Sequence, residues 1–189
     1  MLNRKRLIVV MLLVLPLLSQ LHASSTTTKT VAFLEAYGLD PVVILLIISA
    51  LPVIELRGAI PVGIFLFGMP WHKVAIISII GNMLPIPFLL LLLDKAFAIL
   101  ERFKWGKRFT TWLYARTRRK GKVIERFQAI GLTVFVGIPL PGTGGWTGSL
   151  AAKIFGIRFW NSMLYIFLGV VLAAIIVTAL CLAGLMAVG

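Results

Sequence analysis

Two apolar stretches of this chain resemble each other, and proline and glycine interrupt both of them. The first covers residues 36–81 and the second covers residues 129–169. Four positions recur at a constant offset of 88 residues: Phe67, Gly68, Trp71 and Gly81 correspond to Phe155, Gly156, Phe159 and Gly169. Upstream, Gly38 matches Gly131 at an offset of 93, which predicts that the second stretch is shorter by five residues. Paired, interrupted apolar segments are typical of membrane proteins built from inverted repeats.

The composition is that of a membrane protein. Hydrophobic residues make up 60% of the chain and charged residues only 13%, whereas soluble domains are about a quarter charged. Uncharged runs at 74–93 and 159–189 are long enough to cross a bilayer, which takes roughly 20 apolar residues. The runs at 41–54 and 58–71 are each too short to cross. We therefore predict an all-α integral membrane protein.

The net charge of +13 is distributed unevenly along the chain. Ten of the 19 basic residues lie between Arg102 and Arg126. Lys and Arg concentrate in the cytoplasmic loops of membrane proteins, so residues 95–127 are predicted to form a cytoplasmic loop. Attraction of this loop to anionic headgroups of membrane lipids is a second interpretation. A nucleic-acid partner is not expected.

Residues 1–23 have the layout of a secretory signal peptide. A basic start at residues 4–6 precedes an apolar segment, and Leu21-His22-Ala23 resembles a cleavage site. An uncleaved signal anchor is the alternative. In either case residue 24 emerges outside. Residues 24–40 are then predicted to be an outer-side linker, exposed over 24–30, with an interfacial helix from Val31 to Tyr37.

These assignments determine the topology of the first repeat, residues 41–94. Residue 41 starts outside and the basic loop is inside, so the span at 71–94 must run inward. Residues 41–70 must then enter and leave on the outer side, as a re-entrant hairpin does. Each arm would be roughly 18–21 Å long, enough to pass the middle of a 30 Å hydrocarbon core. Proline and glycine between Pro52 and Pro61 would form its tip.

The second repeat, residues 128–187, is predicted to insert in the opposite orientation. Its hairpin covers 128–156 and its span covers 159–187, which leaves the C-terminus outside. The segment 137–148 contains five glycines and two prolines, so no straight helix can include it. The predicted fold is thus an inverted repeat of re-entrant helical hairpin plus transmembrane helix, with the two tips meeting near the middle of the inner membrane.

Glu55 and Arg57 are the only ionised side chains between Asp40 and Lys73. A charge at membrane depth costs several kcal/mol, so it is paired or functional. In the functional interpretation, Glu55 carries a coupling proton. Arg57 then binds an anionic group, because its guanidinium matches phosphate or carboxylate. In the alternative interpretation, the two side chains form a mutual salt bridge that only closes the tip.

The second tip carries no charge. It offers threonine hydroxyls, an indole and the N–H groups of a glycine-rich turn, which can bind an anion beside a helix N-terminus. The alternative is a flexible bend that lets helices pack closely. The predicted substrate and proton site comprises residues from both tips: Glu55, Arg57, Gly58, Pro61, Pro139, Pro141, Gly142, Thr143, Gly144, Trp146 and Thr147.

The sequence favours neither a metal nor a cofactor. The two histidines are isolated. Cys181 is the single cysteine and is predicted to be a small apolar side chain packed in a membrane span. Asn82 is expected to make a structural polar contact with a hairpin. Pro85 and Pro87 should kink the first span.

Two motifs resemble those of the small multidrug export protein family, over roughly residues 36–187. They are Glu55-Leu-Arg57-Gly58-Ala-Ile-Pro61-x-Gly63 and the run from Pro139 to Gly148. That family is a distant relative of the DedA/VTT membrane proteins, which share two re-entrant hairpins in inverted repeat and include transporters of polyprenyl-phosphate lipid carriers. The resemblance implies that Glu55 and Arg57 are first-hairpin site residues. DedA proteins also carry arginine at the second hairpin, where this chain is uncharged.

The leading hypothesis is therefore a small, multi-pass inner-membrane transporter coupled to protons. A lipid phosphate or an amphipathic small molecule would move by alternating access at the hairpin tips. A non-transporting membrane scaffold or assembly protein is the alternative. An enzyme is not expected, because the membrane-depth residues lack a nucleophile–base set. Membrane lipids are expected partners, and homodimerisation is left open.

Overall fold

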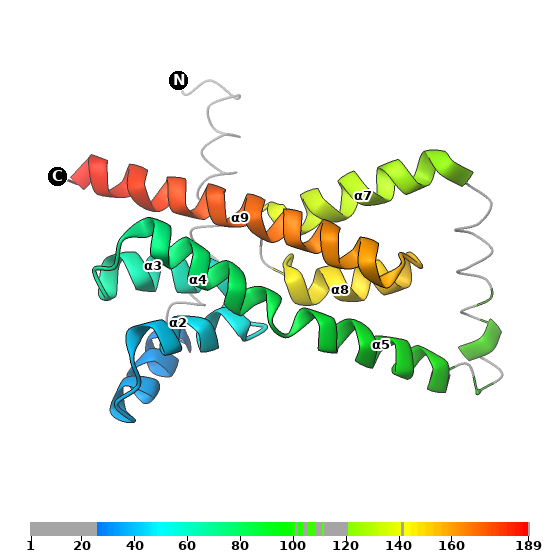
Figure 1. Cartoon of the computed structure of the whole chain (residues 1–189), viewed down its shortest axis with the longest axis horizontal. Helices are drawn as coiled ribbons and strands as arrows, with labels where there is room; N and C mark the ends of the chain where they lie inside the picture. The colour runs from blue at the N-terminus through cyan, green and yellow to red at the C-terminus, as the bar shows by residue number, and fades with distance from the viewer. Residues whose placement is uncertain are drawn as a thin grey trace, which may run out of the picture.

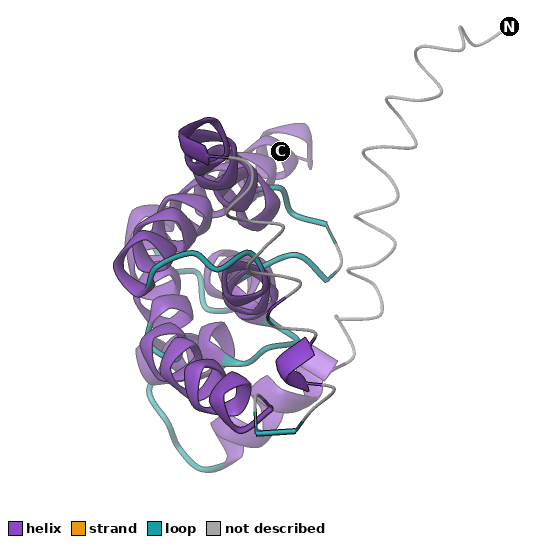
Figure 2. Ribbon diagram, turned by 90° about the vertical axis from the view of Figure 1, so that its right-hand side faces the viewer, coloured by secondary structure: helices purple, strands orange, loops and turns teal. Residues whose placement is uncertain are grey.

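The computed structural model describes residues 26–100, 102–103, 106–108, 111, 121–140 and 142–188. Every regular element within these ranges is a helix (Figures 1 and 2). In chain order the main helices are α2 (Pro41–Ala50), α3 (Glu55–Pro61), the π-helix η1 (Val62–Leu66), α4 (Trp71–Met83), α5 (Ile86–Leu100), α7 (Gly121–Gly137), α8 (Gly145–Ile154) and α9 (Phe159–Val188). The predicted signal segment and part of the basic loop, including residues 112–120, lie outside the described residues.

A short helix at residues 26–36 precedes α2. It begins earlier than the predicted start at Val31, so the segment 26–30 is helical rather than a linker. Thr27 and Val31 are buried. The hydroxyl oxygen of Thr27 lies 3.4 Å from where a Cβ on Gly58 would stand, so this helix packs on α3.

The first hairpin is made of α2, α3 and η1. The side chain of Asp40 caps α2 by accepting a hydrogen bond from the N–H of Val42 at 2.8 Å, and Pro41 suits the first turn because its missing N–H has no helical partner. Residues 51–54 turn the chain, and α3 then packs back against α2. Pro61 ends the α-helical hydrogen bonding, and the chain continues in the wider turn of η1.

The second hairpin consists of α7 and α8, which also contact each other. Residues 138–140 and 142–144 lie in the turn between them. Gly142 has a φ of +75°, in the left-handed region that glycine adopts without strain.

Among the residues that the structure describes, two helical segments are long and apolar enough to cross a membrane: Trp71–Ile99, which comprises α4 and most of α5, and Phe159–Gly184 of α9. The first is interrupted where α4 ends at Met83 and α5 begins at Ile86. This interruption falls at Pro85, as the sequence predicts. The helix continues to Leu100, beyond the predicted end of the span at residue 94.

The two halves of the chain make the same set of contacts. In each half the first hairpin arm packs on its own long helix, α2 on α4 and α7 on α9. The second arm packs on the long helix of the other half, α3 on α9 and α8 on α5. Figure 1 shows that α4–α5 and α9 run in opposite directions, with one hairpin near each end.

The offset of 88 residues corresponds to equivalent local structure. Gly68 and Gly156 both have positive φ, at +60° and +68°. Each lies three residues before the start of a long helix, at Trp71 and Phe159.

Gly81 and Gly169 are equivalent in their packing as well. An added Cβ on Gly81 would stand 2.7 Å from Leu46 O, and one on Gly169 would stand 2.8 Å from Thr133 O. Each glycine therefore lets a long helix approach its own hairpin arm closely.

The upstream offset of 93 residues is wrong as a structural match. Gly38 lies in a turn before α2 with a φ of +69°, whereas Gly131 lies inside α7. Because Leu46 and Thr133 face equivalent glycines, the first arms correspond at an offset of 87 residues. The two hairpins are thus nearly equal in length over the part that packs on the long helices.

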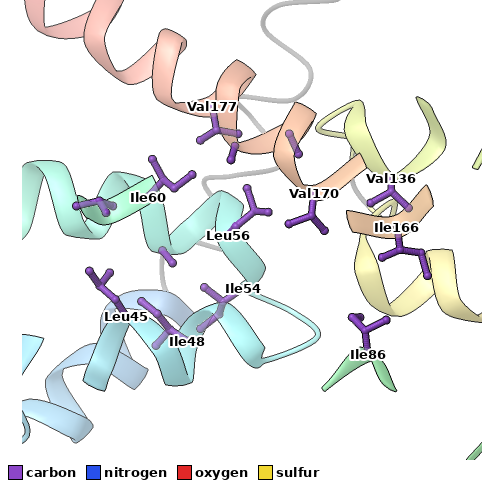
Figure 3. Close-up of a cluster of buried hydrophobic side chains, with 14 of the residues drawn as sticks. Leu45, Ile48, Ile54, Leu56, Ile60, Ile86, Val136, Ile166, Val170 and Val177 are labelled. Carbon is purple, nitrogen blue, oxygen red and sulfur yellow. The ribbon is translucent and has the colours of Figure 1, made fainter. Parts of the chain in front are cut away.

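The core lies between the first hairpin and α9 and continues to the second hairpin (Figure 3). Leu56 of α3 lies near Val170, and Ile60 lies near Val177 (Figure 3). Ile86 lies near Ile166, where α5, α8 and α9 meet (Figure 3). This apolar packing holds the two turns side by side in the middle of the molecule (Figure 1).

Gly169→Ala should destabilise the protein by about 1–3 kcal/mol. The added methyl would stand 2.6 Å from Val136 Cβ and 2.8 Å from Thr133 O, and these atoms cannot rotate away. Thermal unfolding of the purified protein in detergent measures the effect. Gly184→Ala is the matched control, because it lies on the same helix and an added Cβ there has no neighbour within 4 Å. Equal melting temperatures for the two variants would contradict the close approach of α9 and α7.

Candidate functional site

Glu55 is the first residue of α3 and is only 7% exposed. Its φ is +52°, in the left-handed region that a non-glycine residue occupies at a cost of about 1–2 kcal/mol. Its carboxylate lies against Gly144 and accepts hydrogen bonds from the backbone N–H groups of Gly145 and Trp146. These N–H groups form the N-terminus of α8, whose partial positive charge favours a carboxylate.

Arg57 lies two residues further on and points to the other end of the second tip. Its Nη1 donates to Leu140 O at 2.7 Å, and its Nη2 lies 3.2 Å from Val136 O and 3.4 Å from Ile138 O. Nη2 also lies 3.2 Å from Thr143 Oγ1. These carbonyls end α7 and follow it, where the helix dipole favours a cation.

One short helix of the first hairpin therefore places opposite charges on opposite helix ends of the second hairpin. The hydrogen bonds of Glu55 and Arg57 go to that hairpin. Their charges also interact with each other. The interpretation as a mutual salt bridge that only closes the first tip is therefore incomplete, because the two side chains join two tips.

Thr143 organises the turn of the second tip. Its Oγ1 lies 2.8 Å from Ile138 O and 2.9 Å from Leu140 O, and it accepts a hydrogen bond from the N–H of Leu140 at 3.3 Å. A hydroxyl has one proton to donate, so one of the two carbonyls takes it at a time. The carbonyls that receive Arg57 are thereby held in place by a neighbouring side chain.

Trp146 makes a second connection between the tips. Its Nε1 donates to Ala50 O at 3.1 Å, at the C-terminal end of α2. The end of a short helix leaves carbonyl groups without partners in the helix, and the indole satisfies one of them.

Asn82 of α4 contacts both hairpins. Its Nδ2 donates to Ser49 O at 3.3 Å, and its Oδ1 lies 2.7 Å from where a Cβ on Gly145 would stand. The structural contact expected of Asn82 is therefore present, and the residue also borders the tip site. The predicted site did not include Asn82, although an amide within the uncharged run 74–93 could have indicated it.

The predicted site residues divide into three groups. The structure brings together Glu55, Arg57, Thr143, Gly144 and Trp146, and it places Pro139 among the carbonyls that Arg57 contacts.

The second group lies nearby without a contact of this kind. Gly58 packs on Thr27 and Ile54, Pro61 lies at the junction of α3 and η1, and Gly142 makes the turn. Thr147 Oγ1 lies 3.4 Å from Gly144 O, within its own helix. The third group is Pro141 alone, which lies outside the described residues.

This arrangement can bind and release a proton at a carboxylate and exchange ligands at a guanidinium. Within the described ranges, no three residues among His, Cys, Asp and Glu gather as metal ligands. A proton on Glu55 would remove the negative charge that the α8 N-terminus holds. An anion reaching Arg57 would compete with neutral oxygens, since bonds between two charged groups are the stronger ones.

Trp146→Phe should lower the free energy of unfolding by about 1 kcal/mol, because it leaves Ala50 O without its indole donor. Trp160→Phe is the matched control, since Trp160 is 77% exposed. Chemical or thermal unfolding in detergent compares the two variants. A loss at Trp146 no larger than that at Trp160 would contradict the contact between the tips.

Comparison with known proteins gives one result. The sequence model of a family described as "Putative small multi-drug export protein" matches residues 55–176. The match begins at Glu55, includes α3 and the whole second tip, and ends within α9. No curated protein and no solved structure matches the chain. The description names export rather than catalysis. Because the match covers more than half of the sequence, the chain belongs to the small multi-drug export protein family.

Proposed function

We propose that the chain is a small, multi-pass inner-membrane transporter whose transport cycle is coupled to a proton on Glu55. A lipid phosphate or an amphipathic small molecule moves by alternating access at the two opposed tips. One observation carries this proposal: the two charged side chains of one tip hold the two helix ends of the other. The family's description as an export protein points to the same class of function.

The lengths of the helices support re-entrant hairpins. At 1.5 Å per residue, α2 and α8, each of 10 residues, are about 15 Å long, half of a hydrocarbon core of about 30 Å. Irregular backbone at that depth must be buried in protein or line a water-filled cavity. Ile54, Glu55, Gly144 and Gly145 are buried, whereas Val53, Ile138 and Leu140 are exposed and would line such a cavity.

The contacts of the two halves support the inverted repeat. If α4 and α5 are taken together as one long helix, α2, α3 and this helix make the same pairs of contacts as α7, α8 and α9. The proposed orientation places the basic loop 95–127 in the cytoplasm and the C-terminus outside.

Proton coupling follows from the partner of Glu55. While the carboxylate is charged, it holds the N-terminus of α8 through charge-assisted hydrogen bonds and through the helix dipole. A proton weakens both interactions, and the tips then separate. Binding of a proton on one side of the membrane and its release on the other would drive alternation between two arrangements.

The substrate class follows from Arg57 and its surroundings. Its hydrogen-bond partners are neutral carbonyl and hydroxyl oxygens, which a phosphate or carboxylate group can displace. Apolar side chains at both tips are exposed, among them Val53 and Leu140. An anionic head at Arg57 and an apolar body along these side chains describe an amphipathic substrate.

The scaffold alternative has its own supporting observation. The contacts of Glu55 and Arg57 are internal and would also suit a fixed joint between two hairpins. A scaffold requires neither flux nor separation of the tips.

Glu55→Gln should abolish transport driven by a pH gradient, reducing its rate at least about tenfold. The glutamine side chain keeps a similar size but cannot carry the proton. Proteoliposomes are loaded in separate experiments with two anionic probes, a fluorescent amphipathic carboxylate and a fluorescent short-chain polyprenyl phosphate. Glu35→Gln is the control, because Glu35 is exposed on the helix at 26–36.

The outcomes separate the proposals. Flux of either probe in wild type with loss in Glu55→Gln supports proton-coupled transport. Full transport by Glu55→Gln contradicts the coupling. Arg57→Ala with unchanged affinity for the phosphate probe removes the anion-binding role. Absence of flux for both probes in wild type favours the scaffold.

A further inference from the structure

Three buried side-chain oxygens of α2 and α4 have no hydrogen-bond partner. They are Ser49 Oγ, Ser78 Oγ and Asn82 Oδ1, and each residue is at most 1% exposed. Unpaired oxygens are costly to bury, and in native proteins they are usually satisfied by a partner, a water molecule or an ion. The transport proposal uses none of these three atoms.

The contacts place these residues at one crossing of two helices. Asn82 donates to the carbonyl of Ser49 at 3.3 Å, and the Cβ of Ser49 lies 2.8 Å from where a Cβ on Gly81 would stand. Ser78 lies four residues before Asn82, so the two share the buried face of α4. Gly81 brings the two helices into close contact, so the polar side chains on the facing sides of α2 and α4 lie at this crossing.

The orientation of the Asn82 amide follows from its partner. Ser49 O can only accept, so the nitrogen of the amide must face it. The oxygen then points toward Gly145, the neighbour of Gly144, against which the Glu55 carboxylate lies. What remains unpaired on Asn82 is therefore an acceptor.

The charges around this crossing favour a positive ligand. α2 ends at Ala50, and the C-terminal end of a helix carries partial negative charge. The Glu55 carboxylate lies nearby and holds the N-terminus of α8, which would otherwise repel a cation. The guanidinium of Arg57 is directed to the far end of the second tip, at Val136 and Leu140.

We infer that Ser49, Ser78 and Asn82 form a binding site for Na⁺ at the C-terminal end of α2. Hydroxyl and amide oxygens are ligands that hard cations accept. Ends of half-helices serve as Na⁺ sites in membrane proteins. The tight approach at Gly81 favours a small ion. This site goes beyond the proposed function, because bound Na⁺ would join the first hairpin to the first span whether or not the protein transports anything.

The test is thermal unfolding of the full chain in detergent at equal concentrations of NaCl, KCl or choline chloride. A ligand that binds the folded state raises the melting temperature with its concentration. We expect a rise that saturates with Na⁺ and exceeds the rise with K⁺ or choline. In Ser49→Ala and Asn82→Ala, the Na⁺ concentration at half-saturation should increase by at least about tenfold.

Two features keep the test interpretable. Ser49→Ala removes an unpaired hydroxyl, so the variant should fold as well as wild type without Na⁺. Ser149→Ala is the matched control: Ser149 is equally buried, but its hydroxyl donates to Gly145 O at 2.8 Å. This control should melt at a lower temperature in every salt and keep the full response to Na⁺.

Three results would overturn the proposal. Equal melting temperatures in the three salts would mean that a water molecule, not a cation, satisfies these oxygens. A wild-type response to Na⁺ in both Ser49→Ala and Ser78→Ala would place the ion elsewhere. Loss of the response in Glu55→Gln together with its persistence in Ser49→Ala would place the ion at the tip. None of these results decides whether Glu55 couples transport to protons.

Discussion

The arrangement of the two halves depends on the charged contacts that α3 makes with the turn of the second hairpin. An isolated charge in a membrane costs several kcal/mol, and two helix ends buried in protein also lack partners. Glu55 and Arg57 solve both problems at once, because each charge meets a helix end of opposite sign. The apolar core holds the helices in place, and these polar contacts fix how the tips face each other.

The same contacts make the connection between the two tips dependent on protons and anions. An apolar contact between the tips would be insensitive to protons and anions, whereas a carboxylate on a helix N-terminus is sensitive to a proton. The positive φ of Glu55 fits this role, since backbone strain at a buried charge is retained where the surroundings enforce it. Trp146 restricts the movement by linking α2 to the start of α8, and Asn82 links α4 to α2. The result is a joint between two similar hairpins, and only the tip of the first carries charge.

Much of this fold could be predicted from the sequence, because glycine and proline mark backbone events. Gly68 and Gly156 end equivalent helices, Gly81 and Gly169 permit equivalent close contacts, and Pro85 interrupts the first long helix. The match of Gly38 to Gly131 failed because a glycine in a turn and a glycine in a helix look the same in sequence. Glu55 and Arg57 were identifiable from the cost of burying charge. Their pairing was not. The glycine-rich turn predicts N–H groups that can bind an anion, but not that the anion is Glu55, and the carbonyls that receive Arg57 carry no sequence signal.

The most direct test of the account is the distance between the tips as a function of pH. Val53 and Ile138 are exposed tip positions, and spin labels attached through Val53→Cys and Ile138→Cys report this distance by double electron–electron resonance spectroscopy in nanodiscs. Cys181 is replaced by alanine so that only these two positions are labelled. The account predicts a short distance at alkaline pH, a longer one at acidic pH, and the longer one at both pH values in Glu55→Gln. A distance that does not change with pH, in wild type and in Glu55→Gln alike, would contradict the claim that the Glu55 charge holds the two tips together.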